Sequence, residues 1–481
     1  MLQNKSTTIV SEVKDFFTSS EKAINTILTV LSSLTLSEKQ IELRSKSNNE
    51  YRNINKFLLI ILFPFFDIPD AWHYTRSSLY ATFGFGKDVF YRLLNDSLIP
   101  WRKISYKISM QLIGKTSSKS NDKENKQQRC LIIDDSDLPK TGRRIELIGR
   151  VFSHVSNKSI LAFKGLFMGY HDGKSFFALD FSLHGEQGKN HKKPFGLTHK
   201  QLKERYSKFR NKNSVAYQRK EEYFTSKIQS MIEMIRTAIC NGLRFDYVLV
   251  DSWFTCFELV KFIKTRRIGV QLLGMAKMGK TRYFFNGKKL TAKEIVDYQR
   301  KTKKLKRSKQ LASYYSEVLV NFNEIPVKLF FNKASRKGKW HLMLTTDLEL
   351  NFEQAYKIYS TRWSIEVFFK EAKQYLGLGK TQSQDFDAQI ATTTICMLQY
   401  NLLSVARRFT DYESLGELFR NTKAETIQLT VAERIWQIII DVLATLAELF
   451  EIDTEMLMEK LMSDNEKIEK LVNYKTLLQA G

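Results

Sequence analysis

The sequence predicts an α/β protein in which helices pack on a largely buried sheet. Two apolar segments that run into aspartates, CLIIDDS at 130–136 and FDYVLVDS at 245–252, have the composition of buried strands. Two further strand-like segments flank the turn sequence HDGK, with Asp172-Gly173 at its centre, which is typical of a β-hairpin. Strand and helix patterns alternate along this part of the chain, as expected for a sheet covered by helices.

The composition is that of a globular protein with a polyanionic partner. The chain has 481 residues, of which 43% are hydrophobic, and its formal net charge is +25. A charge of this sign and size favours nucleic acid first and an acidic membrane surface second. No basic amphipathic anchor stands out, so we expect no membrane partner.

The positive charge is concentrated before the C-terminal region. Residues 409–481 hold 14 acidic and 7 basic side chains, whereas the preceding 408 residues hold 37 and 69. The nucleic-acid partner is therefore expected to bind the body of the protein, and the acidic helical tail is free to pack or to form a dimer.

Cysteine usage and hydropathy fit a protein of a reducing cytoplasm. The four cysteines form no CxxC pair, which disfavours zinc and a disulfide framework: Cys130, Cys240, Cys256 and Cys396. We find no signal-peptide pattern. The longest apolar run, at 57–66, is too short for a bilayer and contains a proline, so it predicts a buried helix.

The patterns divide the chain into six parts. Residues 1–113 are predicted to be a helical DNA-binding region, because TFGFGKDVFYRLLN at 82–95 suggests a helix-turn-helix; an ordinary helical hairpin is the alternative. The other parts are a polar linker (114–129), the first part of an α/β core (130–277), a basic β-rich insertion (278–345), the last part of the core (346–402) and a helical C-terminal region (403–481).

The segment YSTRWSIEVFFKEAK at 359–373 predicts one amphipathic helix. At 100° per residue, one face carries a phenol, an acid and two bases: Tyr359, Arg362, Glu366 and Lys373. The opposite face is apolar and is expected to pack on the sheet. Such a charged face is most often a solvated surface, so its significance depends on what lies opposite.

Three carboxylates could meet at one point. We expect Asp134 and Asp251 to end two strands and Glu366 to reach them from the covering helix. Oxygen ligands of this kind suit Mg²⁺ or Mn²⁺, and two such ions can promote attack on a phosphodiester. An aspartate at a strand end is more often a cap or turn residue. The hypothesis of a metal site therefore depends on the three carboxylates occurring together in a strongly basic protein.

These motifs resemble those of DDE transposases of bacterial insertion sequences, in particular the insertion-sequence-four group. The signature of that group is Tyr, two residues, Arg, three residues, Glu, six residues, Lys, and 359–373 matches every spacing. IIDDSDLPKTG at 132–142 and VLVDSWF at 248–254 are similar to the first and second aspartate motifs of the group.

The resemblance implies a ribonuclease-H-like catalytic domain with a β-rich insertion. It implies that Asp134, Asp251 and Glu366 hold two Mg²⁺ (or Mn²⁺) ions. It also implies that three side chains of the signature grip phosphates near the cleaved end: Tyr359, Arg362 and Lys373.

The resemblance further implies how such an enzyme acts on double-stranded DNA. The enzyme would cut at terminal inverted repeats and join the freed 3′-OH to target DNA, often through a hairpin on the element end. It would act as a synaptic homodimer in the bacterial cytoplasm, associated with the nucleoid, with the C-terminal region supplying dimer contacts.

Several alternatives stay open from the sequence. Asp135 could replace Asp134 as the first metal ligand, although LIID at 131–134 parallels VLVD at 248–251. Trp340 or Tyr283 could stack on a flipped base or could belong to the core. The protein could also be a related endonuclease that does not join DNA, or an inactive DNA-binding remnant.

Overall fold

The computed structural model describes residues 23–43, 52–117, 128–265 and 269–426. The chain divides into two compact units. One unit comprises 1–35, 49–93 and 406–481, and the other comprises 36–48 and 94–405. Each unit therefore joins segments that lie far apart in the sequence.

The larger unit is built on a mixed sheet. In the described part of the chain, the strand order is β2-β3-β1-β5-β6-β12-β11-β10-β7-β8, with β4 paired to β3 and β9 paired to β10. The strands nearest the site are β1 (Cys130–Pro139), β2 (Gly149–Ser153), β3 (Lys158–His171), β4 (Phe176–His184), β5 (Tyr247–Val250) and β6 (Gln271–Ala276).

Parallel and antiparallel pairing meet at β1. Strand β1 runs parallel to β5, which runs parallel to β6, whereas β3 is antiparallel to both β1 and β4. The four residues of β5, YVLV, are all buried, as expected for a parallel strand covered on both faces. The mixed α/β fold predicted from the sequence is thus confirmed.

The hairpin predicted at HDGK joins β3 to β4. The Asp172 carboxylate accepts hydrogen bonds from the backbone N–H groups of Lys174 and Ser175, and Gly173 has φ +100°. This left-handed conformation favours glycine, because an L side chain is strained there. The turn sequence therefore has the role that its composition indicated.

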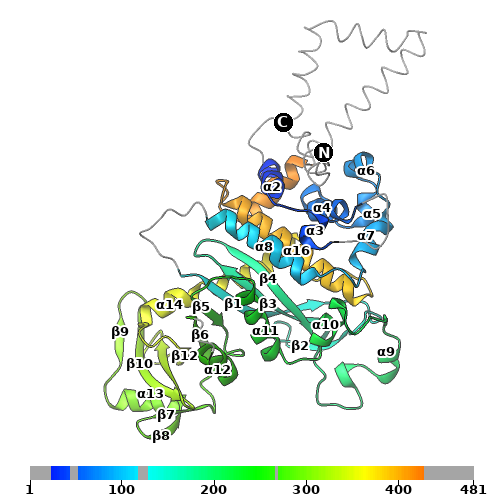
Figure 1. Cartoon of the computed structure of the whole chain (residues 1–481). Helices are drawn as coiled ribbons and strands as arrows, with labels where there is room; N and C mark the ends of the chain where they lie inside the picture. The colour runs from blue at the N-terminus through cyan, green and yellow to red at the C-terminus, as the bar shows by residue number, and fades with distance from the viewer. Residues whose placement is uncertain (1–22, 44–51, 118–127, 266–268, 427–481) are drawn as a thin grey trace, which may run out of the picture. The chain divides into compact units, whose positions relative to one another are not determined.

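Helices cover the exposed backbone of β4. The side-chain amide of Asn401 accepts from the N–H of Ala178 and donates to its carbonyl, at 2.8 Å each, and Ser105 donates to the carbonyl of Leu179. These residues come from α16 (Phe386–Arg407) and α8 (Trp101–Ser117), which lie side by side next to β4 in Figure 1. An edge strand covered in this way cannot pair with another chain.

The two faces of β1 meet different helices. The rings of Phe368 and Phe369, on α15 (Trp363–Tyr375), contact Phe167 of β3. On the opposite face, Lys227 at the start of α11 (Lys227–Cys240) forms an ion pair with Asp135. Successive residues of a strand point to opposite faces, so the sheet is buried between these helices.

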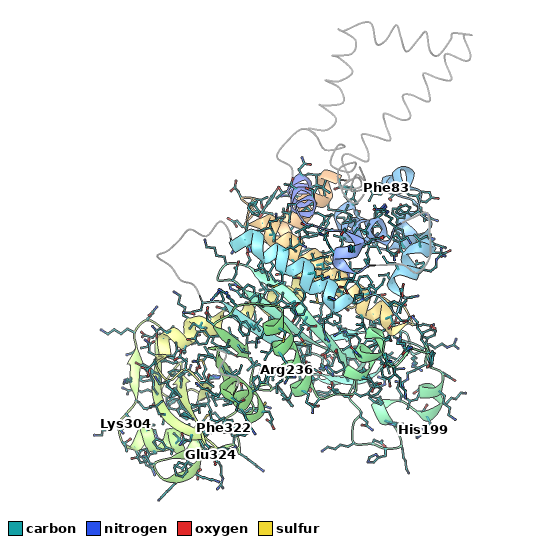
Figure 2. The ribbon with its side chains drawn as sticks, viewed as in Figure 1. Phe83, His199, Arg236, Lys304, Phe322 and Glu324 are labelled. Carbon is teal, nitrogen blue, oxygen red and sulfur yellow. The ribbon has the colours of Figure 1, made fainter. Side chains whose placement is uncertain are left out.

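The predicted β-rich insertion extends the same sheet beyond β6. It contains β7 (Arg282–Phe285), β8 (Lys288–Thr291), α13 (Ala292–Lys301), β9 (Lys306–Ser308), β10 (Ser313–Phe322), β11 (Ile325–Lys333) and β12 (His341–Thr345). Strand β12 pairs with both β6 and β11, so the insertion continues the core sheet. Figure 2 labels Lys304, Phe322 and Glu324 in this part of the unit.

The smaller unit is helical in its described residues. Helix α4 (Asn53–Leu62) contains the apolar run predicted to be a buried helix, and most of its side chains are buried. The helix ends in a 3₁₀ turn around the proline, Phe63–Phe66, whose Phe63 ring contacts Tyr74 and Phe90. A helical segment at 415–426 belongs to this unit, where the Glu425 carboxylate accepts from the N–H groups that begin α2 (Ala23–Ser32).

Three sequence-based boundaries require correction. Strand β1 does not end at Asp134 but continues to Pro139, because its partner β3 is long enough to pair with all of it. The linker predicted at 114–129 begins within α8, which reaches Ser117, and 118–127 lies outside the described residues. The segment 359–373 is two helices rather than one, α14 (Phe352–Ser360) and α15.

The helix-turn-helix pattern at 82–95 has the expected local shape. Helix α6 (Ser78–Phe83) ends at Gly84, which has φ +65°, and α7 (Lys87–Leu94) follows. The local geometry is equally that of a helical hairpin, so DNA binding by this region stays a prediction. Within the described residues, no helix has the length and apolarity needed to cross a membrane.

A buried ion network stabilises the larger unit. The side chain of Arg210 is 0% exposed and donates to Glu146 at 2.7 Å, to Asp387 at 2.8 Å and to Asp385 at 3.3 Å. Lys208 donates to the same two aspartates at 2.9 Å. Removing one member of such a network leaves buried charge without compensation.

We therefore predict that Arg210→Ala destabilises the protein by about 3–5 kcal/mol, because three buried carboxylates lose a charged partner. The midpoint of urea unfolding measures the effect. Arg236→Ala is the matched control, since Arg236 (labelled in Figure 2) pairs with Glu233 on exposed α11 surface and should cost less than about 1 kcal/mol. Equal midpoints for the two variants would contradict the structural role of Arg210.

Candidate active site

The candidate site forms where β1 and β5 lie side by side. Ile133 pairs with Val250 in the parallel register, so Asp134 and Asp251 follow directly at the same level of the sheet. Four apolar residues precede each aspartate, and all eight are fully buried or nearly so. The apolar residues fix both strands in the core, and the register then brings the two carboxylates together.

Asp134 and Asp135 point to opposite faces of β1. Asp134 faces α15, where its Oδ2 accepts from Nη1 of Arg362 at 2.7 Å. Asp135 faces α11, where it pairs with Lys227. Asp137 also has a lysine partner, Lys164 of β3. Among the three aspartates of this motif, Asp134 is therefore the one that faces Arg362 and Asp251.

Asp251 is held by the turn that follows β5. Its Oδ1 accepts from the backbone N–H groups of Trp253 at 2.8 Å and Phe254 at 3.2 Å. In the described part of the chain, its Oδ2 has no hydrogen-bond partner. One carboxylate oxygen thus fixes the side chain, and the second is available to a ligand.

The signature residues reach the site from α14 and α15. Arg362 lies at the junction of the two helices. There the backbone N–H groups of Thr361 and Arg362 form i→i−3 hydrogen bonds, which tighten the chain and interrupt the α-helix. The prediction of one continuous helix was wrong for this reason. Arg362 also pairs with Glu366, four residues further along. Its guanidinium therefore lies between Asp134 and Glu366.

The other two signature residues flank this arginine. The Tyr359 hydroxyl donates to the carbonyl of Val250 at 3.3 Å, and burial raises the pKa of Tyr359 to about 12. Lys373 donates to the hydroxyl of Ser136 at 2.7 Å, and burial lowers the pKa of its ammonium group. All four residues of the signature thus contact β1, β5 or one another, despite the break in the helix.

Burial governs the charge of Asp134. Loss of solvent raises its pKa from 3.8 to about 7; Arg362 opposes this shift, and nearby Asp251 adds to it. The single guanidinium therefore does not fully compensate the buried negative charge. A carboxylate in this condition is stabilised by any further cation that reaches it.

An open cleft lies beside these residues. It has a volume of about 370 Å³, and its lining includes Asp251, Tyr359, Arg362 and Trp340. Trp340 is half-buried, with the ammonium of Lys333 4.6 Å from its ring centroid. Tyr283, the other aromatic considered for stacking, is buried and packs on Phe322, as a core residue does.

The donor set fits a hard divalent cation in chemistry and in charge. The candidate ligands are carboxylate oxygens, which hard cations prefer. Oδ2 of Asp251 has no hydrogen-bond partner among the described residues, and the negative charge of Asp134 is not fully compensated by Arg362. Within the described ranges, no three His, Cys, Asp or Glu side chains lie close enough together to hold a metal ion. The position of Arg362 accounts for this, because its guanidinium lies between two of the three carboxylates.

Two family models match the part of the chain that contains these residues. Residues 78–274 match a model described as DDE superfamily endonuclease, and residues 220–402 match a model described as transposase DDE domain. The two matches overlap, and together they include all six of the predicted site residues. This chain is a DDE transposase.

The transposase differs in sequence from curated proteins but is similar to a solved structure. A search of curated proteins gives no match. Among solved structures, the chain is similar to a piggyBac transposase in a cryo-EM structure of its synaptic complex with hairpin DNA, with a TM-score of 0.42, 14% sequence identity, and coverage of 89% of this chain and 81% of that chain.

As a DDE transposase, the protein cleaves DNA strands and transfers them to new sites, with chemistry that depends on divalent metal ions. The structure adds residues near the site that sequence patterns did not single out. Ser136 is the partner of Lys373, and His341 lines the cleft beside Trp340. The available signal for Ser136 was its position two residues after Asp134, on the same face of the strand.

The raised pKa of Asp134 predicts pH-dependent stability in the absence of metal. The unfolded carboxyl ionises near pH 3.8, whereas the folded one stays neutral to about pH 7, so the unfolding free energy falls as the pH rises between these values. The loss is complete above pH 7 and amounts to roughly 2–4 kcal/mol.

We therefore expect Asp134→Asn to raise the melting temperature in EDTA by a few degrees at pH 8, and the gain to fall to less than half at pH 5. Thermal unfolding followed by circular dichroism measures both values. Asp135→Asn, on the opposite face of β1, should raise the melting temperature at neither pH. A pH-independent effect of Asp134→Asn would refute the assigned burial of charge.

Proposed function

We propose that Asp134, Asp251 and Glu366 are the catalytic carboxylates of the transposase and hold two Mg²⁺ (or Mn²⁺) ions. The observation that carries the proposal is the β1–β5 register, which sets Asp134 beside Asp251, together with the Arg362 bridge from Asp134 to Glu366. When bound, the ions would promote attack by water or a 3′-OH and stabilise the leaving oxygen.

The structure supports Asp134 over Asp135 as the first ligand. Asp135 faces α11 and has Lys227 as its partner, so its carboxylate would have to leave an ion pair and cross the sheet to reach Asp251. Asp134 requires no such movement. The proposal therefore assigns Asp135 a structural role.

We propose that Arg362, Lys373 and Tyr359 bind phosphates of the cleaved DNA end. Arg362 pairs with Asp134 and Glu366, and when metal ions take its place there the guanidinium becomes available to a phosphate. Lys373 lies about two helical turns after Glu366 on α15, where it contacts Ser136. The bases thus offset the repulsion between the carboxylates and the DNA backbone.

We propose that the catalytic domain is ribonuclease-H-like and that the protein belongs to the insertion-sequence-four group. The strand order β4-β3-β1-β5-β6 supports the fold, since β3 is antiparallel to its neighbours and β1, β5 and β6 are parallel. The signature spacing at 359–373 supports the group.

We propose that the enzyme binds terminal inverted repeats as a homodimer and joins the freed 3′-OH to target DNA. The helix-turn-helix shape at α6 and α7 supports a DNA-binding role within 1–113. Most of the C-terminal region proposed to form the dimer, 427–481, lies outside the described residues. A DNA-bound dimer in a bacterial cytoplasm, associated with the nucleoid, follows from this assignment.

Glu366→Gln should abolish strand cleavage, by at least about a thousandfold, while DNA binding stays within a fewfold of wild type, because the amide removes a ligand charge but preserves shape. The assay is cleavage in Mg²⁺ of DNA that carries the gene's own flanks, followed by joining to a second DNA. Cleavage without joining would favour the endonuclease alternative, and specific binding without cleavage by wild type would favour an inactive remnant.

Lys373→Ala should weaken binding to element-end DNA and reduce the salt dependence of binding by about one phosphate contact. Lys370→Ala is the matched control, because Lys370 is an exposed lysine on the same helix. Binding isotherms between 50 and 200 mM salt distinguish the two. Identical slopes for both variants would remove Lys373 from the DNA-binding surface.

A further inference from the structure

A group of exposed aromatic and basic side chains lies next to Asp251. Trp253 is 62% exposed, and the ammonium of Lys277 lies 3.7 Å from its ring centroid. The His154 ring lies 6.3 Å from the same ring, and Phe152, 39% exposed, lies 5.1 Å from His154. We refer to Phe152, His154, Trp253 and Lys277 as the aromatic platform.

The platform is assembled from three separate segments. Phe152 and His154 come from the end of β2, Trp253 from the turn after β5, and Lys277 from the residue after β6. Single exposed aromatics are common on protein surfaces and need no explanation. Here the fold brings together three rings and a cation that are up to 125 positions apart, and it leaves them in solvent instead of burying them.

The position of the platform relative to the carboxylates is fixed. The backbone N–H of Trp253 donates to Oδ1 of Asp251 at 2.8 Å, so the turn that carries the ring also holds the proposed metal ligand. The next residue along from Lys277, Met278, lines the cleft together with Asp251. A DNA strand with its phosphate at the carboxylates would therefore have a neighbouring nucleotide at Trp253.

The chemistry of the platform fits an unpaired nucleobase. In duplex DNA each base is stacked on both sides, so only an unstacked or terminal base offers a ring face to a protein. A large exposed indole binds such a base whatever its sequence, and an adjacent lysine neutralises its phosphate. A protein partner is disfavoured because the platform lies beside the site where the transposase cleaves DNA.

We propose that Trp253, supported by Lys277 and His154, is a positioning residue that stacks on an unpaired base of the DNA strand next to the cleaved phosphate. This inference rests on the proposed assignment of Asp251 to the catalytic carboxylates. Stacking there holds the strand end splayed away from its complement and aligned with the site. The indole binds and orients the DNA and takes no part in bond breaking.

The test compares binding of two DNA probes in EDTA, where no cleavage occurs. Both are element-end duplexes with a short single-stranded 3′ overhang, which carries normal bases in one probe and abasic sites in the other. Stacking contributes about 1–3 kcal/mol per base, so wild type should bind the base-bearing overhang about 5- to 150-fold more tightly. Trp253→Ala should lose this preference and keep its affinity for the abasic probe.

Two further variants separate stacking from a general loss of structure. Trp253→Phe should retain most of the preference, because a ring remains. Phe284→Ala should leave the preference unchanged, because Phe284 is a 44% exposed aromatic of β7 that makes no contact with the platform. A 2-aminopurine in the overhang should lose fluorescence on binding to wild type and not on binding to Trp253→Ala.

The proposal is overturned if wild type binds both probes equally, or if Trp253→Ala weakens binding to both by the same factor. The proposed function is read separately, from Mg²⁺-dependent cleavage of the same duplex by wild type and Glu366→Gln. Cleavage without a base preference would refute the platform alone. A base preference without cleavage would support the platform and count against the catalytic assignment.

Discussion

The site depends on one constraint, the parallel pairing of β1 with β5. Pairing Ile133 with Val250 carries two aspartates out of the hydrophobic core at the same level of the sheet. A shift of one residue in either strand would turn one carboxylate to the opposite face and separate the pair. The four apolar residues that precede each aspartate oppose such a shift, because it would draw a carboxylate into the buried positions that they fill.

The charge balance of the site follows from that register. Two carboxylates near one another in a buried environment repel, and burial raises the pKa of Asp134 to about 7. Arg362 reduces this cost by pairing with Asp134 and Glu366 together. The negative charge is nevertheless not fully compensated, and this condition favours the approach of a further cation. In the proposed metal site, stability and metal affinity would therefore be opposed in the same few side chains.

The two faces of β1 meet different partners. The face towards α15 carries Asp134 and Ser136, which meet the signature residues, whereas the opposite face carries Asp135 and Asp137, which have lysine partners. The insertion then extends the sheet from β6 and contributes Trp340 to the cleft. A single sheet thus supports the carboxylates, the basic side chains of the signature and one wall of the cleft.

The sequence alone predicted the α/β class, the hairpin at Asp172-Gly173 and the signature residues, because apolar periodicity, turn chemistry and motif spacing are local properties. It could not decide between Asp134 and Asp135, since both follow the same apolar run. It also predicted one helix at 359–373 where the chain forms two. The i→i−3 hydrogen bonds at Thr361 and Arg362 interrupt the helix, and no glycine or proline in the segment indicates this interruption. Only tertiary structure decided which aspartate faces Arg362, and only it brought Trp253 to Lys277 and His154. Those contacts join strands that are distant in sequence, and their geometry is set by sheet register and packing, which no local pattern encodes.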